Sequence, residues 1–217
     1  MPEIIGAEHQ FHDEEFAVKW ADRFVPSSDR LELFDLIVAE LESEVPVNGY
    51  VVELGIGPGF LADHVLKAMP EIHYCGVDFS KPMLDIARKR LQSYSARVAY
   101  VQADLVNDAW WTEVPERVSA IASTWALHDL GSPKSIEAVY GNCSNVLPDG
   151  GVLLNGDLIK PDNTTCEYES GRFEIAKHLE MLSRVGFDRV ACLKVFEEEI
   201  ESPTSAQNYA CLRGLKS

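Results

Sequence analysis

The sequence predicts an α/β fold, with a seven-stranded, mostly parallel sheet, an antiparallel C-terminal hairpin and helices on both faces. Three observations predict it. Helical and strand-like patterns alternate from residue 29 to residue 187, and strands separated by helices form parallel sheets covered on both sides. The strand-like segments are short and mostly apolar, which is typical of strands buried on both faces. The last two segments follow each other without a helix, so we expect them to pair.

Apolar periodicity and capping residues mark the individual elements. Asp29 and Glu32 resemble a capping box at the start of the first core helix. Ser80 is expected to cap a later helix, and Ser132, which a proline follows, is expected to cap another. Gly186 is expected to end the last helix. The expected strands are Tyr50–Leu54, Ile72–Val77, Val98–Gln102, Val118–Thr124, Val152–Ile159, Val190–Phe196 and Tyr209–Leu215.

Length and charge limit the possible classes of protein. A chain of 217 residues suits one domain with a short extra segment. We expect residues 29–217 to form that domain and residues 1–28 to form a helical lid segment. With 19 basic and 35 acidic residues, the formal net charge is −16. Because nucleic acids and anionic membranes are bound mainly through Lys and Arg, this charge disfavours both as partners.

The spacing of the cysteines and the distribution of apolar residues indicate in which cell compartment the protein is expected. The five cysteines include no closely spaced pair, so we predict no zinc site and expect reduced thiols. His9 and His12 are not expected to bind a metal either. No stretch approaches the ~20 apolar residues of a membrane helix, and the N-terminus does not resemble a signal peptide. We therefore expect a cytoplasmic protein.

The most informative segment is a glycine-rich turn that follows the first predicted strand and opens a helix. It contains Gly55, Gly57 and Gly59, which allow positive φ angles and close approach of a ligand. Asp78 ends the next strand, roughly 20 residues further on, which is the offset of a carboxylate that binds ribose hydroxyls. Asp104 follows the third strand. Since ligands bind beyond the carboxyl ends of parallel strands, we expect these groups on one rim of the sheet.

A nicotinamide or flavin site is the main alternative for such a turn. The dinucleotide fingerprint is GxGxxG, and its third glycine allows close helix packing and room for the pyrophosphate. In this chain Phe60 stands where that glycine is needed, and the spacing is GxGxG with a proline inside. The sequence therefore disfavours a dinucleotide.

Taken together, these segments resemble the class I S-adenosylmethionine-dependent methyltransferases of the small-molecule type, whose fold is Rossmann-like. The likeness covers residues 29–217 in the family's order. It is carried by the segments 53–59, 74–84, 101–105, 147–153 and 185–187.

The resemblance implies an S-adenosylmethionine site on the rim. Gly55, Gly57 and Gly59 would pass under the methionine part of the cofactor. Glu53 would organise the turn and the cofactor's amino group, and Thr124 would offer its backbone carbonyl to the ammonium.

The resemblance also implies contacts on the adenosine side. Asp78 would bind both ribose hydroxyls, and Phe79 would lie against the adenine face. Asp104 would accept a hydrogen bond from the adenine amino group, with Leu105 packed beside it. Trp20, in the aromatic stripe of residues 1–28, would cover the cofactor as part of the lid, although a helix merely docked by this stripe is an equal interpretation.

Two residues are candidates for catalysis. His128 lies in an Ala-Leu-His stretch after the fourth strand that resembles many small-molecule methyltransferases. Its imidazole titrates near neutral pH, so His128 could deprotonate the acceptor, orient it or serve a structural role. Asp157 lies near the end of the fifth strand and is expected at the same rim. Asp129 stands where the family frequently has a second histidine.

The predicted function is methyl transfer to a small-molecule acceptor, because the charge opposes phosphate backbones and the segments outside the core are short and aromatic. Two alternatives are a methyltransferase acting on tRNA or protein, and a catalytically silent S-adenosylmethionine-binding partner subunit. An aminopropyltransferase is disfavoured, because it needs paired acids where only Asp129 is found. The sequence does not indicate the oligomeric state.

Overall fold

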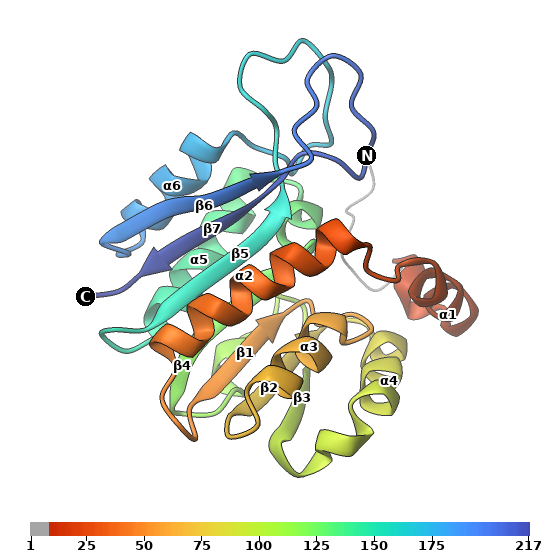
Figure 1. The fold of residues 1–217 in the computed structure, drawn as a ribbon, viewed down its shortest axis with the longest axis vertical. Helices are drawn as coiled ribbons and strands as arrows, with labels where there is room; N and C mark the ends of the chain where they lie inside the picture. Colours follow the sequence, from red (N-terminus) through yellow and green to blue (C-terminus); the bar gives the residue numbers. More distant parts are fainter. Residues whose placement is uncertain (1–8) are drawn as a thin grey trace.

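In the computed structural model, which describes residues 9–217, seven strands form one twisted sheet (Figure 1). The strand order is β3-β2-β1-β4-β5-β7-β6. The first five strands run parallel, and β7 pairs antiparallel with both β5 and β6. The predicted fold class, including the C-terminal hairpin, is confirmed. The strands are β1 (Tyr50–Leu54), β2 (His73–Asp78), β3 (Val98–Gln102), β4 (Val118–Thr124), β5 (Val152–Leu158), β6 (Arg189–Phe196) and β7 (Tyr209–Leu215).

Helices cover both faces of the sheet (Figure 1). Helices α2, α3 and α4 pack on one face, and α5 and α6 pack on the other together with the short helix η3. The α-helices are α1 (Glu14–Arg23), α2 (Ser28–Glu44), α3 (Phe60–Ala68), α4 (Lys81–Arg90), α5 (Pro133–Val146) and α6 (Ile175–Arg184). The 3-10 helices are η1 (Gln10–His12), η2 (Gln92–Arg97), η3 (Trp110–Thr112) and η4 (Leu127–Leu130). Within the described residues, no helix is long and apolar enough to cross a membrane.

Serine side chains begin several of these helices. Ser80 and Ser132 cap α4 and α5 as predicted, each accepting a backbone N–H three residues on. Helix α2 begins earlier than the Asp29 capping box predicts, because the Ser27 hydroxyl accepts the Arg30 N–H. Asp29 instead lies in the first turn, where a negative charge is favourable beside the helix N-terminus.

The position of α2 is set by a close contact with the sheet. Leu33 is fully buried, and three of its side-chain atoms lie only 2.7, 3.0 and 3.2 Å from the position that a Cβ on Gly156 of β5 would take. The absence of a side chain at Gly156 therefore lets α2 approach the sheet closely. This contact holds the first turn of α2, with Arg30, next to the carboxyl ends of the central strands.

Two loops project together beyond the end of β5 (Figure 1). They are residues 159–174, between β5 and α6, and residues 197–208, between β6 and β7. Arg172 joins them: it is 4% exposed, its Nε lies 3.0 Å from Glu169, and its guanidinium donates to the carbonyls of Ser205 and Gln207. These contacts of Arg172 hold the β6–β7 loop beside the rim of the sheet.

We expect Gly156→Ala to lower the free energy of unfolding by about 1–3 kcal/mol, the usual effect of overpacking a core. The new Cβ would lie 2.7 Å from a Leu33 methyl. Urea unfolding measures the change. Gly141→Ala in α5 is the matched control, because its Cβ would meet nothing closer than 3.8 Å. Equal stability of the Gly156→Ala variant and the wild type would show that α2 does not pack this closely.

Candidate active site

The glycine turn after β1 is the floor of the site. Gly55 and Gly57 have φ angles of 69° and 49°, in the region that favours glycine. A Cβ on Gly55 would lie 2.4 Å from the Ala126 Cβ, whereas a Cβ on Gly57 would meet no protein atom within 4 Å. Gly59 caps α3 and packs against Ala87 of α4. The turn thus packs tightly against the protein at Gly55 and is open at Gly57.

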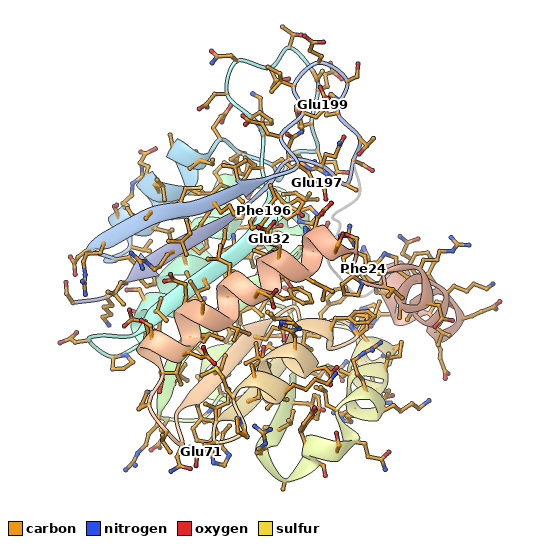
Figure 2. All side chains as sticks on the ribbon, in the orientation of Figure 1. Phe24, Glu32, Glu71, Phe196, Glu197 and Glu199 are labelled. Carbon is orange, nitrogen blue, oxygen red and sulfur yellow. The ribbon has the colours of Figure 1, made fainter. Side chains whose placement is uncertain are left out.

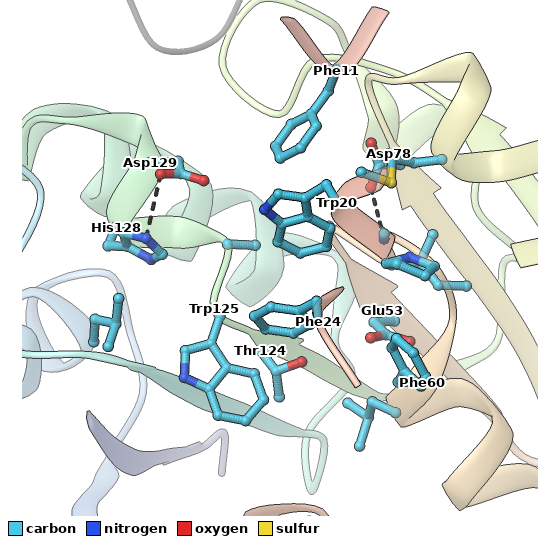
Figure 3. Close-up of a pocket in the computed structure, with 18 of the residues that line it drawn as sticks. Phe11, Trp20, Phe24, Glu53, Phe60, Asp78, Thr124, Trp125, His128 and Asp129 are labelled. Atoms are coloured by element: carbon cyan, nitrogen blue, oxygen red, sulfur yellow. Dashed lines mark hydrogen bonds and ion pairs between the residues drawn. The ribbon is translucent and has the colours of Figure 1, made fainter. Parts of the chain in front are cut away.

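A cavity of about 420 Å³ lies above this turn (Figure 3). Its wall is formed by the carboxyl ends of β1, β2 and β4, by η1 and α1, by the first turn of α2 and by the β6–β7 loop. Nine of the predicted site residues line it: Trp20, Glu53, Gly55, Gly57, Asp78, Phe79, Leu105, Thr124 and His128. Gly59, Asp104 and Asp157 do not line the cavity.

Two buried carboxylates lie on one side of the cavity. Glu53 is 1% exposed, and burial raises its pKa to about 8 although it accepts a hydrogen bond of 2.8 Å from the Tyr74 hydroxyl. Asp78 is 6% exposed, and burial raises its pKa to about 6 against the opposing effect of the N–H groups of Gly57 and Ser80, at 2.8 and 2.9 Å. Glu53 has no cationic side chain as an ion-pair partner within the described residues, and the His12 imidazole attracts Asp78 and lowers its pKa slightly against the effect of burial. Both are therefore suited to a ligand that brings hydrogen-bond donors or positive charge.

These features fit S-adenosylmethionine. The open space at Gly57 would admit the cofactor's chain, Glu53 would accept from its amino group, and Asp78 retains lone pairs for the ribose hydroxyls. Phe79 and Leu105 are the apolar wall beside Asp78.

Asp104 lies apart from this wall. Its Oδ1 accepts the backbone N–H groups of Val106 and Asn107 at 2.8 and 3.1 Å, and its Oδ2 accepts from the Asn107 side chain at 2.9 Å. The carboxylate thus organises its own turn, and its contact with adenine stays a prediction.

The opposite side of the cavity contains a histidine held by a buried carboxylate. Asp157, 1% exposed, contacts His128 twice: its Oδ1 lies 2.7 Å from Nδ1, and its Oδ2 accepts the backbone N–H at 2.9 Å. Burial alone lowers the pKa of His128, but the Asp157 carboxylate outweighs it and raises the pKa to about 9. On its other edge, Nε2 lies 3.3 Å from Asp129 Oδ1 (Figure 3). At neutral pH the imidazole therefore carries a positive charge.

Residues 9–24 close the cavity from outside. Trp20 of α1 stacks on Phe24 with ring centroids 4.4 Å apart, and its edge meets Phe11 at 5.2 Å (Figure 3). Phe11 in turn lies 6.4 Å from Phe79. The stripe that the sequence indicates is therefore turned toward the cavity, while residues 1–8 lie outside the described part of the chain.

Sequence patterns missed further wall residues, among them Arg30, Phe34 and Trp125. Trp125 has a φ of 47°, which turns the chain after β4 and places the indole under Phe24 at 5.9 Å. Arg30 lies over both rings, 4.1 Å from the Phe24 centroid and 5.0 Å from that of Trp125. Figure 2 places Phe24 and Glu197 near this first turn of α2. The position of Arg30 in the helical pattern carried no signal of this role.

Arg30 differs from the other arginines that are not exposed. Arg97 donates to backbone carbonyls, and Arg172 and Arg213 form ion pairs with Glu169 and Glu40. Within residues 9–217, the Arg30 side chain has no hydrogen bond or ion pair, although Glu197 attracts it at longer range. Its guanidinium is available to an anionic group in the cavity. Among the described residues, no cluster of three or more His, Cys, Asp or Glu could hold a metal ion.

Solved structures with the same fold include several methyltransferases. An O-methyltransferase family protein from Burkholderia thailandensis superposes with a TM-score of 0.71 at 18% identity, covering 99% of this chain and 64% of that one. Human N-acetylserotonin methyltransferase, in complex with S-adenosylmethionine, gives a TM-score of 0.66 at 14% identity, over 98% of this chain and 60% of that one. The architecture is the Rossmann-like fold of class I methyltransferases.

The sequence comparisons agree. Residues 51–151 match the family model described as a methyltransferase domain. Trans-aconitate 2-methyltransferase of Paracidovorax citrulli is 31% identical over 57% of this chain and 44% of that protein. The tRNA N(3)-methylcytidine methyltransferase Mettl2 of Drosophila melanogaster is 27% identical over 56% of this chain and 38% of its own. The chain spans about half or less of the length of such relatives.

We expect Gly57→Ala to weaken binding of S-adenosylhomocysteine by about 1–3 kcal/mol, because the new methyl group would occupy the open space over the turn. Calorimetry measures the affinity. Gly150→Ala is the matched control: Gly150 also has a positive φ, 82°, and a Cβ there also meets nothing within 4 Å, but it lies outside the cavity. Both variants should lose about 1–2 kcal/mol of stability through backbone strain. Equal affinities in the two variants would place the ligand elsewhere.

Proposed function

We propose that this chain transfers a methyl group from S-adenosylmethionine to a small-molecule acceptor. One observation carries the proposal: a single cavity has the buried carboxyl groups of Glu53 and Asp78 on one side and a charged His128–Asp157 pair on the other (Figure 3). The first side suits the cofactor, and the second side suits an acceptor with polar groups.

Different residues on the first side of the cavity bind different parts of S-adenosylmethionine. Glu53 and the carbonyl of Thr124 hold the amino group, while Arg30, which has no ion pair within the described residues, holds the carboxylate of the methionine part. Asp78 holds the ribose, and Phe79 and Leu105 hold the adenine. The proposed cofactor site also includes three other residues that the sequence predicts: Gly55, Gly59 and Asp104.

The bound cofactor supplies a methyl group that is already activated by its sulfonium. The chain's main task is to align the acceptor, and good alignment alone can remove roughly 7–11 kcal/mol of a barrier. His128 acts on the acceptor as a charged hydrogen-bond donor, since its raised pKa keeps it protonated at neutral pH. Asp157 fixes the ring and its charge.

Several features favour a small acceptor over a macromolecule. Aromatic side chains from α1 and η1 cover the cavity, and small ligands bind in such enclosed, mostly apolar pockets. The net charge of −16 opposes a nucleic-acid backbone. The likeness to trans-aconitate 2-methyltransferase agrees with a small acceptor. The likeness to a tRNA methyltransferase makes tRNA the second candidate.

The test is a transfer assay with methyl-labelled S-adenosylmethionine against a small-metabolite fraction, total tRNA and a protein extract. We expect label in the small-metabolite fraction. His128→Gln should lower the rate about 10²–10³-fold, the effect of removing one donor from a charge-stabilising site, with S-adenosylhomocysteine affinity unchanged. His73→Gln is the control, because His73 starts β2 at the opposite end of the sheet.

Other outcomes of this assay are equally informative. Label in tRNA or protein would replace the proposed acceptor, and cofactor binding without any transfer would favour a silent partner subunit. The pH profile distinguishes the roles of His128. A charged donor with a pKa of about 9 gives a rate that falls above that pH, whereas a general base gives a rate that rises through it.

We further propose that residues 1–28 form a lid over the domain of residues 29–217. Trp20→Ala should weaken S-adenosylhomocysteine binding by about 1.5–3 kcal/mol, through loss of a large apolar contact, and leave the circular dichroism spectrum unchanged. Val18→Ala on the same helix is the control, since Val18 is 43% exposed. Unfolding of the Trp20→Ala variant would identify Trp20 as a core residue instead.

A further inference from the structure

The acceptor side of the cavity contains a second carboxylate, Asp129. It lies in η4, directly after His128, and its side chain is 37% exposed on the cavity wall (Figure 3). The imidazole of His128 therefore lies between two carboxylates. Asp157 is sealed behind the ring, and Asp129 stands at the open side.

These three groups differ in their ability to accept a proton. Asp157 is 1% exposed, and its oxygens already accept from the Leu158 N–H at 2.8 Å and twice from His128. The ring nitrogens of His128 lie 2.7 and 3.3 Å from carboxylate oxygens, which keeps the ring protonated. Apart from its contact with His128, the Asp129 carboxylate has no hydrogen bond or ion pair within residues 9–217. Asp129 is the carboxylate of this group that can receive a proton from a molecule in the cavity.

The surroundings of Asp129 support this assignment. Burial raises its pKa, as do the neighbouring carboxylates of Asp157 and Glu169, while the cations His128 and Arg172 lower it. The net effect is a pKa above the usual range of an aspartate. Its carboxylate is thus a better proton acceptor than that of an exposed aspartate.

We propose that Asp129 is a catalytic residue that accepts the proton of the methyl acceptor, and that the acceptor therefore presents an O–H or N–H group to it. The inference rests on the proposed methyl transfer. As the methyl carbon bonds to the acceptor oxygen or nitrogen, its bond to sulfur breaks and the bonding pair stays on the sulfur. The acceptor's proton passes to an Asp129 oxygen and from there to solvent, while His128 keeps its own proton.

Asp129→Asn tests the proposal, because it keeps the shape of the side chain and removes the proton acceptor. We expect transfer of label into the small-metabolite fraction to fall about 10²–10⁴-fold, the usual contribution of a general base. The acidic limb of the pH profile should vanish, and Asp129→Glu should recover part of the rate. Asp149→Asn, at an exposed turn between α5 and β5, removes the same charge and should leave the rate unchanged.

A second measurement does not depend on activity. Titration of the His128 ring by NMR should give a lower pKa in the Asp129→Asn variant, because a neighbouring negative charge is lost, and the affinity for S-adenosylhomocysteine should not change. Wild-type rate and pH profile in that variant would overturn the role of Asp129 while leaving the proposed function intact. Failure of the wild type to bind S-adenosylhomocysteine or to transfer label would instead overturn both.

Discussion

The Asp78 carboxylate ties together the parts of the rim on which the site depends. Its Oδ2 accepts the N–H of Gly57, in the turn after β1, and its Oδ1 accepts the N–H of Ser80, at the start of α4. One buried side chain therefore sets the relative position of a turn, a strand end and a helix. The same carboxylate faces the cavity, so the group that organises the rim is also the one that we propose to bind the ribose. Because Asp78 is only 6% exposed, its negative charge is unfavourable unless hydrogen-bond donors surround it. The two hydroxyl groups of a ribose are such donors.

The two sides of the cavity are opposite in their charge requirements. Glu53 and Asp78 are buried acids whose pKa values are raised by burial, whereas His128 is a cation held between carboxylates. A ligand with an amino group and hydroxyls fits the first side. On the second side, the charge of His128 is balanced within the protein, so a neutral acceptor can bind there without leaving a buried charge unpaired.

Sequence patterns predicted the fold and most of the rim for the same reason. Strand ends such as Glu53, Asp78 and Thr124 are located by local apolar runs, and parallel strands bring their carboxyl ends to one edge. The role of Arg30 was not predictable in this way. It reaches the cavity because a Leu33–Gly156 contact, distant in sequence, sets the approach of α2. Asp104 was expected at the cavity because it follows a strand, but its carboxylate accepts hydrogen bonds from the backbone N–H groups of Val106 and Asn107 in its own turn. The position of a residue along a strand thus predicts where its side chain begins, but local hydrogen bonds determine whether that side chain points into the cavity.

The place of β7 in the sheet has a consequence for folding during synthesis. Strand β7 follows β6 in the chain but lies between β5 and β6. Until residues 209–215 have left the ribosome, β5 remains an open edge and β6 has no partner in its final register. The growing chain thus exposes an apolar, unpaired strand at a stage when the half of the sheet that contains β1, β2 and β3 is already complete, and an unpaired edge invites association with other chains. Chaperone dependence during biosynthesis should therefore concentrate on the C-terminal half of the sheet.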